Sequence, residues 1–210
     1  YVSLVYQGIC QDKASKYSDA VNSLKTAAGI EPNNPLAHSQ LGLTYYGGKN
    51  YVESERSLRR AVQLKPDDYF YRYRLGLALY EQERYGEAMT EAKESIRLKS
   101  DYSYAHGLYG DTLYGAKQYK EAVVEYRESL RLKPGDASVH YQLGQSYYGL
   151  KDWASASVAF RETVKLAPND YDAWVYLGNS LDYEMRLTEA IDAYKEALKL
   201  RPDNAMAYSE

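Results

Sequence analysis

A period of 34 residues runs through this chain and constrains its fold more than any other feature. Glycine stands at the eighth place of six successive stretches, and alanine stands at the twentieth place of all but the second, which has Ser54. Proline occupies the thirty-second place of every stretch except the third, which has Ser100. Agreement in register over six stretches predicts a repeat protein, in which each repeat buries its apolar face against its neighbours.

The repeat at residues 103–136 shows what each one is expected to form. Apolar and small side chains recur at intervals of three and four in both of its halves, which is typical of two amphipathic helices. They lie at Tyr109, Gly110 and Leu113, and then at Ala122, Tyr126, Ser129 and Leu130. Because Lys117 and Gln118 stand at the break between these stripes, the pattern predicts a helical hairpin.

The sixth repeat carries the fullest set of landmarks, namely Trp174, Leu177, Gly178, Ala190, Tyr194, Ala197 and Pro202. These residues resemble the tetratricopeptide repeat, or TPR. The resemblance implies an all-α, right-handed superhelical solenoid of antiparallel helix hairpins. It covers six repeats, at 1–34, 35–68, 69–102, 103–136, 137–170 and 171–204, and residues 205–210 are expected to start a further helix of a longer protein.

Composition excludes several classes of function. No apolar run approaches 18 residues, so we expect no insertion into a membrane. The net charge is −3 and neither half of the chain is basic, so we expect no nucleic-acid partner. Cys10 is the only cysteine, which excludes a disulfide within the chain. The compartment is left open, with the cytoplasm favoured.

We expect neither an enzyme nor a metal or cofactor site. His38, His106 and His140 all stand at the fourth place of their repeats. Equivalent side chains on adjacent hairpins should lie about 8–10 Å apart and point the same way, which does not suit a shared zinc ion. We therefore interpret the histidines as packing residues. The sequence has no phosphate-binding glycine loop, GxSxG or HExxH motif.

Repeat junctions carry helix-start signals at the thirty-fourth place. Short polar side chains, which accept hydrogen bonds from free helix amides, stand there at Asn34, Asp68, Asp136, Asp170 and Asn204. Tyr102 departs from this rule, and we expect Asp101 or Ser103 to cap the following helix instead. The junction between the third and fourth repeats is therefore predicted to be the least regular.

The resemblance also implies a partner-binding groove lined by the first helix of each repeat. Mapping the family's groove-facing places onto this chain selects Tyr46, Phe70, Tyr73, Arg74, Tyr80, Tyr104, Asp111, Tyr114, Tyr141, Gln145, Tyr148, Tyr176 and Asn179. Four of these form a ladder of tyrosines at the twelfth place, at residues 46, 80, 114 and 148. Phe70, Tyr73 and Arg74 make the most concentrated patch, and such residue types dominate binding hot spots.

Other features near the groove have structural interpretations. Tyr17, Tyr51, Tyr85 and Tyr119, at the seventeenth place, are expected to be buried between hairpins. Glycines follow three ladder tyrosines, at Gly47, Gly115 and Gly149. We favour a helix C-cap role for them, with open space for a ligand as the alternative.

These observations predict a scaffold that binds an extended peptide or a helix of a partner protein in the tyrosine-rich groove. Clamp-type binding of a chaperone terminus is not expected, because no lysine stands at the second or fifth places that such members use. Two alternatives stay open. One is self-assembly through end-to-end stacking of repeats, which would give a homo-oligomer, and the other is a role as an accessory domain of a larger enzyme.

Overall fold

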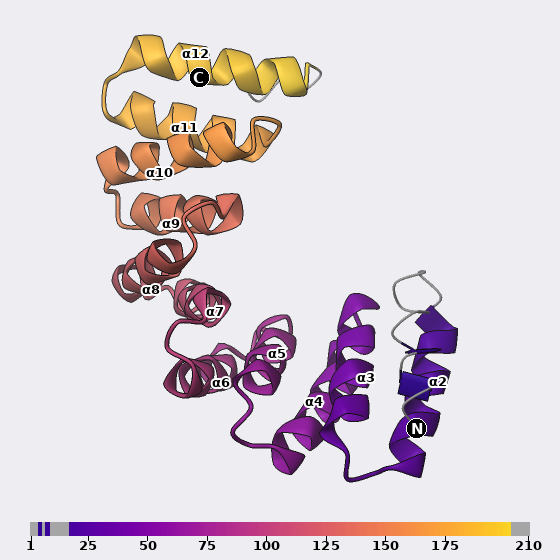
Figure 1. Cartoon of the computed structure of the whole chain (residues 1–210). Coiled ribbons are helices and arrows are strands. Elements are labelled where there is room, and N and C mark those ends of the chain that lie inside the picture. Colours follow the sequence, from indigo (N-terminus) through magenta and orange to yellow (C-terminus); the bar gives the residue numbers. More distant parts are fainter. Residues whose placement is uncertain (1–3, 6, 9–16, 203–210) are drawn as a thin grey trace. The chain divides into compact units, whose positions relative to one another are not determined.

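The chain folds into a succession of antiparallel helices, as Figure 1 shows. The computed structural model describes residues 4, 5, 7, 8 and 17–202. All regular structure in these residues is helical. The helices are α2 (Tyr17–Ile30), α3 (Pro35–Gly47), α4 (Tyr51–Leu64), α5 (Tyr69–Tyr80), α6 (Tyr85–Leu98), α7 (Ser103–Gly115), α8 (Tyr119–Leu132), α9 (Ala137–Gly149), α10 (Trp153–Leu166), α11 (Tyr171–Tyr183) and α12 (Leu187–Leu200). The predicted all-α fold is confirmed.

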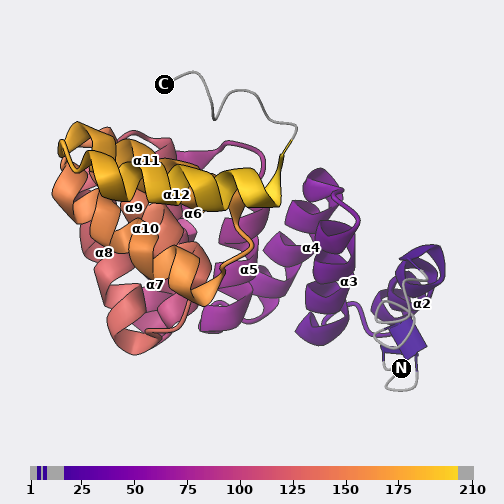
Figure 2. The ribbon, with the colours of Figure 1, turned by 90° about the horizontal axis from the view of Figure 1, so that it is seen from above.

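Helices pack in the order of the chain, within two compact units, Tyr1–Thr112 and Leu113–Glu210. In the first unit α3 packs on α4 and α5 packs on α6. Helix α4 also packs against α5, which is the first helix of the next hairpin. Figure 2 shows α3, α4 and α5 side by side. The second unit repeats this arrangement, with α9 on α10, α10 on α11 and α11 on α12. Because α3 also contacts α5, the first helices of successive hairpins share one layer in the first unit.

The hairpins close because the eighth place carries no side chain. A Cβ atom added at Gly144 would lie 2.7 Å from the ring of Phe160, and one at Gly178 would lie 2.4 Å from the ring of Tyr194. Both rings occupy the twenty-fourth place of the same repeat, on the second helix. The recurring glycine therefore lets the two helices approach until a bulky side chain fills the space between them.

Most helix-start predictions are confirmed, apart from that at Asn204, which lies outside the described residues. The side chain of Asn34 accepts from the Leu36 amide at 3.1 Å, and the Asp68 side chain accepts from two amides at 3.1 and 3.2 Å. Asp170 accepts from the Ala173 amide at 3.0 Å. The prediction of a capping bond at Asp136 is wrong, because its side chain accepts no hydrogen bond from a helix amide. It accepts one from the Lys133 ammonium instead, at 2.9 Å.

The histidines act at the junctions between repeats. The Nε2 atoms of His38, His106 and His140 lie 3.0, 3.1 and 3.0 Å from the carbonyl oxygen six residues earlier, at the thirty-second place of the preceding repeat. A carbonyl can only accept, so Nε2–H donates in each case. Arg72 and Trp174 hold the same place and donate to equivalent carbonyls at 3.1 and 2.9 Å. The fourth place therefore supplies a junction hydrogen bond from three different residue types.

In each hairpin whose turn the structure describes, the turn contains a left-handed residue that is not glycine. Lys49, Glu83, Lys117, Lys151 and Met185 have φ angles between 57° and 61°, and all stand at the fifteenth place. No described glycine has a positive φ. The C-cap role predicted for Gly47, Gly115 and Gly149 is therefore wrong, because the chain reverses two residues later.

We expect the change Lys151→Gly to raise the free energy of unfolding by about 1 kcal/mol, because glycine adopts a left-handed conformation without the steric cost of a Cβ atom. Chemical denaturation of the two proteins measures this difference. The neighbouring change Leu150→Gly is the matched control and is expected to destabilise, since Leu150 has a right-handed backbone with φ −81°. A loss of stability in Lys151→Gly would contradict the prediction.

Candidate functional site

Five aromatic side chains gather on the first helices of the N-terminal unit. Tyr69, Phe70 and Tyr73 come from α5, Tyr102 immediately precedes α7, and Tyr104 lies in its first turn. The Tyr102 ring centroid lies 5.0, 6.2, 5.3 and 5.5 Å from those of Tyr69, Phe70, Tyr73 and Tyr104. Tyr104 is 46% exposed, so this aromatic cluster reaches the surface. Burial raises the pKa of the Tyr102 hydroxyl above its usual range.

Arg74 lies against this cluster and is 8% exposed. Its Nη1 atom donates to Ser39 Oγ on α3 at 2.8 Å, and its guanidinium carbon lies 3.9 Å from the centre of the Phe70 ring. Its Nε atom is buried without a hydrogen-bond partner. Burial lowers the pKa of the Arg74 guanidinium to about 10, so the side chain still carries its charge at neutral pH.

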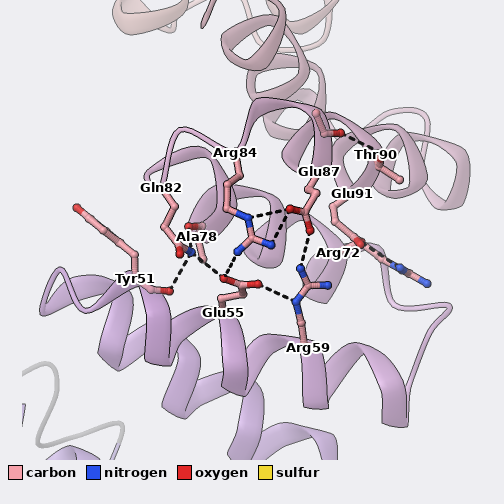
Figure 3. A network of polar contacts seen from close by, with 11 residues as sticks. Tyr51, Glu55, Arg59, Arg72, Ala78, Gln82, Arg84, Glu87, Thr90 and Glu91 are labelled. Carbon is pink, nitrogen blue, oxygen red and sulfur yellow. Dashed lines mark hydrogen bonds and ion pairs between the residues drawn. The ribbon is translucent and has the colours of Figure 1, made fainter. Parts of the chain in front are cut away.

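Arg59 on the outer helix α4 and Arg84, which immediately precedes the outer helix α6, have carboxylate partners. Figure 3 shows Glu55 of α4 accepting from Arg59 Nε at 2.8 Å, Gln82 Nε2 at 3.0 Å and Arg84 Nη1 at 2.6 Å. Glu87 of α6 accepts from both arginines at 2.8 Å. Burial opposes ionisation of Glu55, but these hydrogen bonds prevail and hold its pKa below the usual range. The network joins the hairpin α3–α4 to the hairpin α5–α6.

The C-terminal unit repeats part of this network at equivalent places. Arg161 of α10 donates to Glu189 of α12 at 3.0 Å, and Arg186 donates to both Glu189 and Glu184. In both units these arginine–carboxylate pairs join one hairpin to the next, although Glu184 Oε1 is buried without a hydrogen-bond partner. We therefore assign these two networks to the stability of the array and not to binding.

Each ladder tyrosine packs against the aromatic residue five positions later in its own repeat. The ring centroids of Tyr46 and Tyr51 lie 5.5 Å apart, and those of Tyr80 and Tyr85 lie 5.6 Å apart. The Tyr46 hydroxyl donates to Glu81 Oε1 at 3.0 Å, and burial together with this bond raises its pKa. The ladder tyrosines are therefore half-buried residues with a structural role as well as an accessible edge.

The seventeenth-place tyrosines are less buried than predicted. Tyr51, Tyr85 and Tyr119 are half-buried, and Tyr17 is 36% exposed. The Tyr119 ring lies over Gly149, where an added Cβ atom would come within 2.9 Å of it. The space beside Gly149 is thus filled by the chain itself.

Predicted groove residues of the C-terminal unit are linked by hydrogen bonds. Tyr114 donates to Gln145 Oε1 at 2.8 Å, and Gln145 Nε2 donates to the Tyr141 hydroxyl at 2.8 Å. The ring of Tyr148 lies 4.9 Å from that of Trp153, and that of Tyr114 lies 5.4 Å from that of Tyr119.

Two further predicted residues of this unit, Tyr176 and Asn179, lie on α11. The Tyr176 ring centroid lies 5.4 Å from that of Tyr148 and stacks on Phe160 at the same distance. Asn179 accepts from the Tyr194 hydroxyl at 2.7 Å. Burial raises the pKa of the Tyr141 and Tyr148 hydroxyls to about 12. These tyrosines therefore stay neutral at physiological pH and offer hydroxyl groups, not charges.

The structure thus divides the predicted groove residues into two sets. Residues that the N-terminal unit brings together are Phe70, Tyr73, Arg74 and Tyr104, while Tyr46, Tyr80 and Asp111 lie half-buried on α3, α5 and α7. Those of the C-terminal unit are Tyr114, Tyr141, Gln145, Tyr148, Tyr176 and Asn179. Sequence reasoning missed Ser39, Tyr69 and Tyr102. The last of these had a signal, because it replaces the capping residue at its junction.

Comparison with protein-family models identifies the family. A model described as a tetratricopeptide repeat matches residues 53–103 and 141–205, and a model described as a TPR repeat matches residues 13–47 and 110–151. The chain belongs to the tetratricopeptide repeat family. Its recurring glycines, alanines and prolines are therefore TPR landmarks, as the sequence predicts. A search of curated protein sequences returns no match.

Solved structures of other TPR proteins share the fold. PilW, described as a widely conserved type IV pilus biogenesis factor, has a TM-score of 0.87 at 16% identity, covering 98% of this chain and 96% of that chain. Pseudomonas aeruginosa PilF has a TM-score of 0.84 at 18% identity, with 98% and 93% covered. YrrB, described as a TPR protein with an unusual peptide-binding site, has a TM-score of 0.73 at 17% identity, with 88% and 95% covered.

The described part of the TPR chain offers no arrangement typical of catalysis by a metal. Among residues 17–202 and the four described before them, no three histidine, cysteine or acidic side chains gather where they could hold an ion. None of the described helices has the length and apolar character that crossing a bilayer requires. The aromatic cluster around Arg74 is therefore the most distinctive candidate site in this part of the chain.

Proposed function

We propose that this TPR chain is a non-catalytic scaffold that binds an extended peptide or a helix of a partner protein along the first helices of its repeats. One observation carries the proposal, the aromatic cluster of Tyr69, Phe70, Tyr73, Tyr102 and Tyr104, which includes an exposed ring. Tyrosine and phenylalanine bury large areas at little cost in conformational entropy, and tyrosine adds a hydroxyl group for hydrogen bonding.

Further support comes from the contrast between the two layers of the N-terminal unit. The outer helices α4 and α6 carry ion pairs that are satisfied within the chain. The first helices α3 and α5 instead carry aromatic rings, and Arg74, which is buried and makes no ion pair, lies among them. Interface hot spots are enriched in tyrosine and arginine in this way. That a related fold is described as having a peptide-binding site agrees with the proposal.

Site-specific photo-crosslinking tests this function. A benzoylphenylalanine placed at Tyr104 is expected to form a covalent adduct with a partner protein in the native host. The matched control is the same group at Val158, which is 61% exposed on the second helix α10. We expect adducts from position 104 and none from position 158. Adducts from position 158 alone, or none from position 104, would contradict the proposal.

The end of the described array favours self-assembly as a second candidate function. Tyr183, Met185, Leu187 and Ile191 are all exposed there, Met185 by 77%. At the preceding junction, the seventeenth-place residue Trp153 stacks on Tyr183 with ring centroids 4.3 Å apart. Leu187 holds the same place in the last repeat. If this end face joins two copies, the mass in solution rises with concentration and Leu187→Glu restores the monomer; a constant monomer mass contradicts self-assembly.

A further inference from the structure

A cavity of about 410 Å³ lies at the surface where α5 meets α6. Its lining includes Arg72 from α5 and Thr90, Lys93, Glu94 and Arg97 from α6. Three of these side chains are cations. None of them belongs to the aromatic cluster or to the predicted groove residues, so the cavity is a separate feature of the N-terminal unit.

Ion pairs occupy only part of the two guanidinium groups in this cavity. Arg72 donates through Nη1 to Glu91 Oε2 at 3.0 Å, as Figure 3 shows, and through Nε to the Pro66 carbonyl at 3.1 Å. Arg97 donates through Nε and Nη2 to the two oxygens of Glu94, at 2.8 Å each. The remaining nitrogens, Nη2 of Arg72 and Nη1 of Arg97, make no hydrogen bond to a described residue. Each guanidinium therefore keeps a donor for a ligand.

Lys93 is a cation of this cavity with no carboxylate partner among the described residues. Its side chain is exposed, and its Nζ atom lies 5.1 Å from the centre of the Tyr109 ring. Two carboxylates, Glu91 and Glu94, face the three cations of the cavity, so one positive charge is left over. Since both oxygens of Glu94 already accept from Arg97, the Lys93 ammonium is the charge most available to an anion.

The next repeat offers a natural comparison, because it keeps part of this arrangement. In α8, Arg131 donates to both oxygens of Glu128 at 2.8 and 2.7 Å, and Arg127 stands at the place of the lysine. However, Val124, which is 63% exposed, stands where the cavity has its threonine, and His106 stands where it has the arginine of α5. Arginine occupies this fourth place only in the third of the six repeats. The full set of donors is therefore particular to one repeat.

We propose that this cavity binds a phosphate monoester, with Lys93, Arg72 Nη2 and Arg97 Nη1 donating to its oxygens. A phosphate monoester carries a charge of about −1.5 to −2 at neutral pH and three strong acceptor oxygens. Donors from three separate side chains suit oxygens that point in three directions, whereas a carboxylate offers two oxygens in one plane. The inference goes beyond the proposed function, because it uses no groove residue.

The phosphate can come from a small molecule or from a phosphorylated side chain of a protein, since both present the same three oxygens. Titrations of the full chain, followed by the NMR shifts of its backbone amides at constant ionic strength, separate these sources. The probes are free phosphoserine, a short glycine–alanine peptide with one central phosphoserine, and the same peptide with serine or glutamate at that position. Tighter binding of the phosphopeptide than of free phosphoserine assigns the phosphate to a protein, and equal binding assigns it to a small molecule.

Both phosphate probes are expected to give saturable shifts at the amides of Thr90, Lys93 and Arg97. The serine peptide should give none, and the glutamate peptide should bind about tenfold more weakly than the phosphopeptide. Lys93→Gln should lose about fivefold or more in affinity for phosphoserine, although it breaks no ion pair. The matched control Arg127→Gln removes the same charge at the equivalent place of the next repeat and should keep the affinity of the parent chain.

Other results would overturn the inference. Shifts elsewhere than in α6, or none with any probe, would refute the site. Equal affinity for the phosphoserine and glutamate peptides would refute the choice of phosphate, and equal losses in Lys93→Gln and Arg127→Gln would reduce binding to general attraction by charge. Circular dichroism of each variant ensures that a loss of binding is not a loss of fold. Because Tyr104→Ala should bind phosphoserine like the parent chain, failure of this site leaves the scaffold function standing.

Discussion

Replacing Arg74 by methionine is expected to raise the free energy of unfolding by about 1 to 3 kcal/mol, because it removes a buried charge that no described residue pairs with. The gain is limited by the loss of the hydrogen bond to Ser39 and of the contact with the Phe70 ring. If Arg74 served packing alone, the same substitution would lower the free energy of unfolding. A gain in stability combined with a loss of peptide binding would mark Arg74 as a functional residue.

The pH dependence of this gain has a defined sign. Burial in the folded chain lowers the pKa of Arg74 from its usual value to about 10, so below about pH 10 the group is protonated in both the folded and the unfolded chain. The stabilisation of Arg74→Met over the parent chain should therefore be constant between about pH 6 and pH 9, and should decline only at higher pH, where the folded parent loses the proton. Denaturation curves at several pH values measure this.

Arg72→Met provides the matched control for the stability measurement. This substitution leaves Glu91 without its ion-pair partner and the Pro66 carbonyl without its hydrogen-bond donor. We therefore expect it to lower stability, although it makes the same chemical change two residues away on the same helix. Destabilisation of similar size by both substitutions would contradict our interpretation of Arg74.

The largest loss of stability is expected from Phe160→Ala, at about 3 to 5 kcal/mol, because this ring is fully buried beneath the first helix of its hairpin. Gly144→Ala should cost about 1 to 3 kcal/mol for the reverse reason, since its Cβ atom would lie 2.7 Å from that ring. Both substitutions act on the same space between the two helices, because the Cβ atom added at Gly144 would meet the Phe160 ring. In the double variant, the added methyl group fits into the cavity left by the ring, so the combined loss should be smaller than the sum of the two.

A double-mutant cycle on unfolding free energies measures this coupling. Gly86→Ala is a suitable control, because a Cβ atom there has nothing within 4 Å and the residue lies inside α6. It should be neutral or slightly stabilising. Additive losses at Gly144 and Phe160 would show that the glycine is not required by the ring.

The sequence predicts the helix hairpins well because their determinants recur every 34 residues. A small residue at the eighth place and a bulky residue at the twenty-fourth make the same contact in several repeats, as Gly144 with Phe160 and Gly178 with Tyr194 show. The turns were less predictable. Their left-handed place is occupied by lysine, glutamate or methionine, and these residue types give no signal for such a backbone.

The candidate site was predictable only in part. The spacing of Phe70, Tyr73 and Arg74 along the first helix predicted that they share one face. It did not predict that Arg74 is buried. That burial depends on Ser39, which lies 35 residues earlier and accepts the hydrogen bond from Nη1, and on rings that cover the guanidinium. Such a contact between repeats varies from one junction to the next, so a shared period cannot reveal it.

Hydrogen–deuterium exchange with and without a peptide selected on the chain tests the central claim most directly, because it reports which helices the ligand covers. We predict slower exchange in α3, in α5 and in the first turn of α7, with little change in α4 and α6. Slower exchange confined to α4 and α6, or to the exposed end at α12, would contradict binding along the first helices.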